Sequence, residues 1–334
     1  MRNPGWAAAA ALTVLTAMAP AVAQRLDGFN VIQAPGHPFG GASALRALTA
    51  AKRVGATAIA IVPFLWQPAP ASPDLVRGND MSDAGLREAI RQVRGIGLAA
   101  VVKPHVWVPG SWAGAVAPGS ERDWRAWFGN LRREILRIAR IAAEEQAEAL
   151  VVGTELARTS RRPEWNEVIA AARAAFAGQL LYVAHNDEEA LAIPFWPQLD
   201  AIGVSLYPVL GDDQDRSFRL AAMRAAIEPI ERLADRSGKP IVVGEIGLRS
   251  AAHAAARPWE SAEERASAAD PMLQAEVLAD WLTVLDRAAV QGVLVWRWLS
   301  DPMAGGPADT DFTVQGKPAE GVLLCVWRLR CGRN

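Results

Sequence analysis

Short apolar runs recur along the chain, and segments with helical spacing separate most of them. The eight runs cover residues 28–32, 56–64, 98–103, 149–155, 180–184, 201–206, 241–248 and 292–296. They are continuous apolar stretches rather than alternating ones, a pattern typical of parallel strands that are covered on both faces. The sequence therefore predicts eight buried parallel strands.

Amphipathic segments fill the intervals between these runs. Helices are predicted at residues 43–54, 82–95, 121–149, 217–237, 271–289 and 317–330, with a further helix opened by Pro163. One interval, between the fifth and sixth runs, is reduced to a loop that contains Pro194 and Pro197. This alternation predicts an α/β fold, a single-domain (β/α)8 TIM barrel. A doubly wound open sheet is the rival fold, but no Gly-rich phosphate-binding turn follows the first run.

The first residues match a secretory signal peptide. Arg2 provides a positive start, residues 6–18 are apolar, and Ala21 and Ala23 fit a small-x-small cleavage site before Gln24. A membrane anchor is the alternative, but the apolar run is short for a span and lacks a stop-transfer flank. We therefore expect residues 1–23 to be removed. The domain of residues 24–334 is then secreted or periplasmic and free of the membrane.

Cys325 and Cys331 are the two cysteines of the chain, and both lie near its C-terminal end. An oxidising compartment allows such residues to pair. On one continuous helix, however, their spacing would point them apart. The sequence leaves the pairing open.

Composition and charge exclude several classes of function. The formal net charge is −1, which favours neither nucleic acid nor an anionic membrane as a partner. Only four histidines are present, none paired at metal-ligand spacing, so we expect no metal site. A phosphate loop, a nucleophile elbow and a catalytic-cysteine context are also missing, and no cofactor is expected.

Two glutamates occupy the positions where barrels keep their chemistry. Glu155 and Glu245 each stand at the carboxyl end of an apolar run. Glycosidic bond cleavage needs one carboxyl group to protonate the leaving oxygen and, in retaining enzymes, a second to attack the sugar, about 5 Å away. The alternative role for either glutamate is a structural ion pair with an arginine. A carboxylate after an apolar run is costly to bury without a function, which favours the catalytic role.

Several short motifs, in order, resemble glycoside hydrolase family 113, a β-mannanase-type TIM-barrel family in the clan of retaining barrel glycosidases. The stretches that carry the resemblance are Lys103-Pro-His-Val, Val152-Gly-Thr-Glu-Leu, Phe195-Trp, Leu199-Asp-Ala-Ile-Gly-Val, Tyr207-Pro, Gly244-Glu-Ile-Gly, Trp296-Arg-Trp and Gly316-Lys-Pro-Ala-Glu. The resemblance implies endo-hydrolysis of a β-1,4-linked mannan-type polysaccharide with retention and without a metal. It also implies that Glu155 is the acid/base and Glu245 the nucleophile.

The chain departs from the family pattern at two places near the implied sugar subsite. Many members of the clan have asparagine directly before the acid/base, where this chain has Thr154. After the fifth strand, His185 and Asn186 occupy the region in which close relatives have an asparagine–tryptophan pair. The resemblance therefore marks Thr154, His185 and Asn186 as residues that bind the sugar.

Polar residues at other strand ends complete the predicted site. Lys103 and His105 flank a proline after the third run, and we expect both to point toward sugar hydroxyls. Tyr207, after the sixth run, is expected to donate its hydroxyl to Glu245, as a tyrosine does in the clan. With such donors or a cation nearby Glu245 stays ionised, whereas a negative neighbour in a desolvated cleft is expected to raise the pKa of Glu155.

Thirteen tryptophans against two tyrosines provide flat aromatic faces that suit sugar rings. Trp296 and Trp298 are two residues apart on a predicted strand, so we expect them to share a face that meets the ligand. Trp107, with Trp66 and Trp112, follows the second and third strands and is expected to extend the cleft. The alternative role for each tryptophan is packing in the core.

The sequence thus predicts a retaining glycosidase that acts on a β-1,4-linked mannan. Two alternatives stay open, namely the same chemistry on another β-glycan, such as a glucan or an exopolysaccharide, and a non-catalytic glycan-binding barrel.

Overall fold

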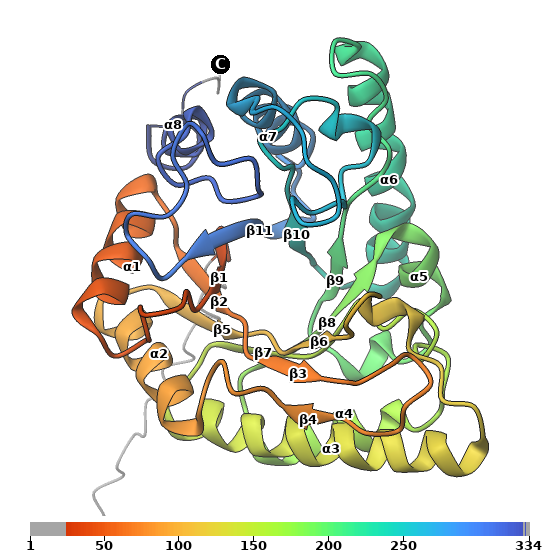
Figure 1. The fold of residues 1–334 in the computed structure, drawn as a ribbon. Coiled ribbons are helices and arrows are strands. Elements are labelled where there is room, and N and C mark those ends of the chain that lie inside the picture. The colour runs from red at the N-terminus through yellow and green to blue at the C-terminus, as the bar shows by residue number, and fades with distance from the viewer. Residues whose placement is uncertain (1–24, 330, 332–334) are drawn as a thin grey trace, which may run out of the picture.

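The structure is a computed structural model that describes residues 25–329 and 331. The predicted signal peptide of residues 1–23 lies outside the described residues. Eight parallel strands close into a barrel, with helices around it (Figure 1). In barrel order the strands are β1 (Gly28–Ile32), β2 (Ala58–Ile61), β5 (Ala99–Val102), β7 (Ala149–Thr154), β8 (Gln179–His185), β9 (Ile202–Ser205), β10 (Ile241–Ile246) and β11 (Val290–Leu299), which pairs with β1. The predicted TIM barrel is confirmed.

Amphipathic helices cover the outside of the barrel. They are α1 (Ala42–Val54), α2 (Asp83–Gly95), α3 (Glu121–Glu144), α4 (Trp165–Ala175), α5 (Asn186–Ala192), α6 (Arg216–Ser237), α7 (Pro271–Val284) and α8 (Pro318–Leu324). Local caps fix where some of them begin. The Ser82 hydroxyl accepts from the N–H of Gly85 over 3.0 Å, and Ser120 accepts from Asp123 over 3.1 Å. Within the described ranges, no helix is both long and apolar enough to cross a membrane.

Several helix boundaries differ from the prediction. Helix α3 ends at Glu144, because Gln146 adopts a left-handed conformation (φ 55°) and the N–H of Ala147 returns to the carbonyl of Ala142. Helix α7 also ends earlier than predicted, at Val284 rather than at residue 289. Pro163 lies in the turn before α4 rather than inside it. The interval expected to be a loop contains α5, whose first turn carries three acidic residues that suit the positive end of a helix dipole.

Two layers of apolar side chains hold the barrel. Small residues such as Ala58, Ala60 and Ala99 form one cluster with Val151 and Val183. The larger cluster packs the other faces of the strands against the helices. Strands that are apolar on both faces produce both layers, which is why they appear in the sequence as continuous runs.

A second, three-stranded sheet continues beyond β2 and β5. Its strands are β3 (Phe64–Trp66), which pairs in parallel with β6 (His105–Trp107) and antiparallel with β4 (Val76–Arg77). Pro63 and Pro104 separate the new strands from the barrel, since proline has no N–H to donate to a ladder. The prediction of one strand over residues 56–64 is therefore wrong, since Phe64 belongs to β3, and the apolar pattern does not predict this second sheet.

The two cysteines form a disulfide with a Cα–Cα separation of 5.2 Å. Helix α8 ends at Leu324, and a wider π-helical turn, Cys325–Leu329, follows it. The N–H of Cys331 donates to the carbonyl of Cys325 over 3.0 Å, which brings the chain back on itself. The segment is therefore not one continuous α-helix, and the pairing that the sequence left open is present.

Trp298 packs in the core rather than at the barrel mouth. Its ring lies 4.7 Å from that of Phe29, and the side chain is buried. Trp296, by contrast, is half-buried and lies near the Lys103 ammonium group. The ladder between β1 and β11 skips Arg297, so the simple alternation of faces is broken between the two tryptophans. The prediction that they share a ligand-binding face is wrong.

Replacement of Trp298 with alanine is expected to lower the free energy of unfolding by about 3–5 kcal/mol, because it leaves a large cavity in the core. Chemical denaturation measures this change. The matched control is Trp259→Ala at a half-exposed tryptophan, where we expect less than about 1 kcal/mol. Equal effects of the two substitutions would contradict the core position of Trp298.

Candidate active site

Glu155 and Glu245 lie at the carboxyl-terminal end of the barrel, where α/β barrels place their chemistry. Glu155 directly follows the last residue of β7, and Glu245 lies one residue before the end of β10. Their side chains retain 13% and 5% of their accessible surface. The negative charge of each therefore acts in a site that is nearly shielded from solvent.

Glu245 is held by two side chains, one for each carboxylate oxygen. The Lys103 ammonium group, itself fully buried, forms an ion pair with Oε1. The Tyr207 hydroxyl donates to Oε2 over 3.1 Å, as predicted. Burial and the neighbouring carboxylates raise the pKa of Tyr207 above its usual range, so the hydroxyl keeps the proton that it donates. Lys103 was expected to face sugar hydroxyls, but its ammonium group is committed to Glu245.

Glu155 is held by its backbone and by a histidine. Its φ of 55° lies in the left-handed region, which non-glycine residues adopt rarely, and its N–H donates to the carbonyl of Val183 over 2.7 Å. The side-chain Oε1 lies 3.1 Å from Nδ1 of His185. Asn186, the next residue, has φ 53°. Backbone outliers of this kind persist only where neighbouring structure holds them, and they cluster at functional sites.

A series of contacts through His185, Asn186 and the whole Tyr207 residue connects the two glutamates. Asn186 Oδ1 accepts from the backbone N–H of Tyr207 over 2.9 Å, which turns the amide nitrogen toward Nε2 of His185 at 3.0 Å. His185 then contacts Glu155, and the Tyr207 hydroxyl contacts Glu245. His185 and Asn186 were predicted to bind sugar directly. In this structure the His185 ring contacts Glu155, and the Asn186 side chain contacts His185 and the backbone N–H of Tyr207.

The pKa values of the glutamates diverge in the opposite sense to the prediction. Burial alone would raise the pKa of Glu155, but the hydrogen bond to His185 and the charges of His185, His105 and Lys103 outweigh it and lower the pKa to about 2. Burial raises the pKa of Glu245, and the charge of Glu155 adds to this, while Lys103 opposes it. The expected raised pKa of Glu155 is therefore wrong for the protein without substrate.

His185 itself keeps a proton more readily than an ordinary histidine. Burial lowers its pKa, but the hydrogen bond to Glu155 and the charges of Glu155, Glu189 and Glu245 raise it above the usual 6.5. Asn186 opposes protonation, because its amide donor faces Nε2. The carboxylates prevail, and the net effect is a raised pKa of His185.

Behind this pair lies a buried hydrogen-bonded support, Glu189 and Tyr182, which the sequence motifs did not predict. Glu189 of α5 accepts from the Tyr182 hydroxyl and from the N–H of His185, both over 2.6 Å. Tyr182 in turn accepts from the N–H of Leu156 over 3.1 Å. Burial raises the pKa of Glu189 to about 7. The support holds the backbone next to both Glu155 and His185, and its sequence signal was the acidic first turn of α5.

A protein-family comparison identifies the family. The model of Glycoside Hydrolase Family 113 matches residues 30–317. The chain belongs to glycoside hydrolase family 113. The resemblance found in the sequence motifs is thereby confirmed, and the chain is a glycosidase-family barrel whose substrate class is a glycan.

Solved structures share the fold of this family 113 chain. The GH113 β-mannanase AaManA from Alicyclobacillus acidocaldarius, in complex with ManMIm, has a TM-score of 0.82 at 21% identity over 92% of this chain and 98% of its own. Another GH113 β-1,4-mannanase complex has a TM-score of 0.81 at 24% identity, covering 91% and 99%. A β-glucuronidase from Ruminococcus gnavus has a TM-score of 0.62 at 14% identity, covering 91% and 50%. No curated protein sequence matches the chain.

The remaining predicted site residues divide into two groups in this family 113 barrel. Thr154 is buried and its hydroxyl donates to the carbonyl of Pro104 over 3.2 Å, so its hydroxyl proton is committed to the backbone that follows β5. His105, Trp107 and Trp296 remain partly accessible. Burial and the charge of Lys103 lower the pKa of His105 to about 4, so its ring is neutral at pH 7.

Trp112 lies beside His185. Its ring is 4.9 Å from that of His185, and 45% of the residue is exposed. No group of three or more His, Cys, Asp or Glu side chains within residues 25–329 and 331 is placed to hold a metal ion.

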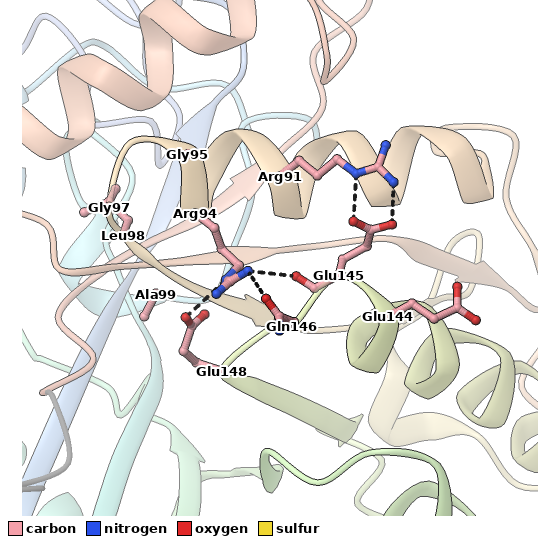
Figure 2. A pocket seen from close by; sticks show the side chains of 10 residues that line it. All are labelled: Arg91, Arg94, Gly95, Gly97, Leu98, Ala99, Glu144, Glu145, Gln146 and Glu148. Carbon is pink, nitrogen blue, oxygen red and sulfur yellow. Dashed lines mark hydrogen bonds and ion pairs between the residues drawn. The ribbon is translucent and has the colours of Figure 1, made fainter.

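A pocket of about 560 Å³ lies at the opposite end of the barrel, beside the first residue of β5 and the turn that precedes β7 (Figure 2). Its charged groups already pair with one another. Arg91 binds both carboxylate oxygens of Glu145 over 2.7 Å, and Arg94 contacts Glu148. The amino-terminal face of a TM barrel serves stability rather than chemistry, so we assign no catalytic role to this pocket.

Replacement of His185 with glutamine is expected to destabilise the fold in a pH-dependent manner. The lowered pKa of Glu155 stabilises the folded state fully above about pH 4.5 and less as the pH falls through about 2. The raised pKa of His185 contributes below about pH 6.5, and this contribution is lost as the pH rises through the folded value. The loss, about 2 kcal/mol for a hydrogen bond to a charged group, is therefore greatest near pH 5–6.

Urea unfolding of both proteins at about pH 3, 5.5 and 9 tests this expectation. The control is His253→Gln, since His253 is an exposed histidine. A destabilisation by His185→Gln that is the same at all three pH values would contradict a charged pair.

Proposed function

We propose that this protein is a retaining glycoside hydrolase that cleaves a β-1,4-linked mannan-type polysaccharide by double displacement. The observation that carries the proposal is the pair of nearly buried glutamates, each held by its own hydrogen bonds, at the mouth of a family 113 barrel. A retaining mechanism requires two carboxyl groups held on fixed supports on opposite sides of the anomeric carbon.

Glu245 acts as the nucleophile in this proposal. Lys103 and Tyr207 each contact one of its oxygens, which fixes the orientation of the carboxylate and favours the ionised form. As the sugar becomes an oxocarbenium-like species, Glu245 attacks the anomeric carbon and the bond to the leaving oxygen breaks. The product of this step is a glycosyl ester on Glu245.

Glu155 acts as the acid and then as the base. It must carry a proton when the leaving oxygen departs, although the protein without substrate holds it as a carboxylate beside His185. We infer that Glu155 takes up a proton from solvent as a glycan binds, because the exclusion of water favours the uncharged carboxyl group. Glu155 then donates the proton to the leaving oxygen, and later removes one from the water that hydrolyses the ester.

The mannan assignment rests on the family and on two similar structures that are named β-mannanases. A specific observation favours a second candidate, the same chemistry on another β-glycan. His185 stands directly beside Glu155, in a region where the close relatives have a different pair of residues. Its ring therefore shapes the subsite next to the cleaved bond, where the sugars of β-glycans differ.

We expect the purified protein to release reducing sugar from β-1,4-mannan faster than from β-glucans, with the new anomeric centre initially in the β configuration. Proton NMR of the fresh product reports that configuration. Glu155→Gln and Glu245→Gln should each reduce kcat/KM more than about a thousandfold. Faster release from a glucan would select the second candidate, and an initial α anomer would contradict double displacement.

A matched variant separates a catalytic from a structural role of Glu245. Glu245→Gln leaves the buried Lys103 without its counter-charge, which is expected to lower stability by several kcal/mol. The double variant Lys103→Met with Glu245→Gln removes the charge and should regain stability without regaining activity. Recovery of turnover in the double variant would exclude Glu245 as the nucleophile.

We further propose that the protein is exported after cleavage before Gln24. The support is the charged start, apolar run and small-x-small site of residues 1–23. When the full chain is expressed in a bacterium, amino-terminal sequencing of protein outside the cytoplasm should begin at Gln24. Uncleaved chain in the membrane fraction would instead indicate an anchor.

A further inference from the structure

One face of the second sheet is a row of aromatic side chains. Strands β3 and β6 pair in parallel with Phe64 opposite His105 and Trp66 opposite Trp107. Successive side chains of a strand point to opposite faces, so these four residues share one face. The residues between them, Leu65 and Val106, are buried on the other face.

This row is continuous with the candidate active site. Starting near Glu245, the Lys103 ammonium group lies 5.4 Å from the ring centre of Trp296, which lies 6.3 Å from His105. From His105 the row continues to Phe64 at 6.1 Å and to Trp107 at 5.9 Å from Phe64. It ends at Trp66, 6.1 Å from Trp107. The aromatic faces thus lead from the catalytic centre to the surface.

The two outer rings stay accessible although they are large and apolar. Trp66 is 38% and Trp107 42% exposed. The Trp66 ring also packs directly against Gly78, so closely that a Cβ at this position would collide with the indole nitrogen. The N–H of Gly78 donates to the carbonyl of Phe64 over 3.0 Å, which keeps this glycine beside the ring. An exposed indole with a fixed orientation is suited to stacking on a ligand.

A glycan chain fits the row better than a protein surface does. A stable protein interface buries about 800 Å² on each partner, and its apolar core is a broad patch. Here the exposed apolar surface is a single file of rings that begins at the site where a sugar chain is cut. Pyranose rings present C–H faces that pack on indoles as other apolar faces do.

We propose that Trp66 and Trp107 form a distal subsite for the same linear β-glycan, several sugar units from the cleaved bond. This proposal rests on the proposed hydrolase function and extends it. The subsite makes the enzyme favour chains that are long enough to reach both Glu245 and Trp66, as an enzyme acting within a polymer does.

The test measures kcat/KM of wild type and Trp66→Ala on a series of manno-oligosaccharides from the disaccharide to the hexasaccharide, and on polymer. We expect Trp66→Ala to lose about tenfold on the hexasaccharide and on polymer, mainly through KM, and less than about twofold on the shortest chain cleaved. Trp66→Phe keeps an aromatic face and should restore most of the loss.

Phe218→Ala is the matched control. Phe218 is 50% exposed, it lies over Gly211 as Trp66 lies over Gly78, and it belongs to the outer helix α6. We expect this variant to behave as wild type at every chain length. A loss for Trp66→Ala that is equal at all lengths, or no loss, would overturn the subsite.

Binding of hexasaccharides, followed by tryptophan fluorescence, separates failure of this proposal from failure of the proposed function. If the wild-type protein cleaves mannan and Trp66→Ala cleaves it equally well at every chain length, the subsite alone is refuted. If the wild-type protein cleaves neither mannan nor glucan but binds one of them, and Trp66→Ala does not bind it, the hydrolase function is refuted and the subsite is supported. Absence of both cleavage and Trp66-dependent binding refutes both. Sedimentation that shows Trp66→Ala dissociating a wild-type dimer, with chain-length dependence intact, would make the row an interface between copies.

Discussion

The buried ion pair between Lys103 and Glu245 is the interaction on which the rest of the site depends. Both side chains are almost inaccessible to water, so each would be costly to bury without the other. They come from β5 and β10, which are not neighbours in the barrel, and therefore they meet only when the barrel is closed. The ion pair fixes one oxygen of Glu245, and the other oxygen accepts a hydrogen bond from Tyr207, which connects Glu245 to the other residues of the site.

Glu155 depends on a different kind of constraint. Its left-handed backbone and that of Asn186 place two side chains in positions that ordinary strand and helix geometry does not reach. Helix α5 and the buried Glu189 hold the turn that carries His185. The result is a pair of glutamates with different partners, one beside a lysine and the other beside a histidine.

The sequence predicted correctly those features that depend on one local pattern, such as a run of apolar residues. Continuous apolar runs identified all eight barrel strands, and carboxylates after two of those runs identified Glu155 and Glu245. It failed where two distant segments decide the outcome. Thr154 donates to a carbonyl in the segment that follows β5, Trp298 changes face at an irregularity in the ladder, and Lys103 contacts a carboxylate 142 residues away.

The sequence by itself determined the barrel, its family and the strand ends that carry the two carboxylates, because the alternation of strands and helices and the motif order are local properties. Only the tertiary structure decided which glutamate lies beside a lysine and which beside a histidine. It also decided that burial outweighs Lys103 and raises the pKa of Glu245, whereas His185 outweighs burial and lowers the pKa of Glu155. It also decided that Phe64, Trp66, His105 and Trp107 form one row. Charge environment and ring-to-ring contact depend on the distance between strands, which no single stretch of sequence specifies.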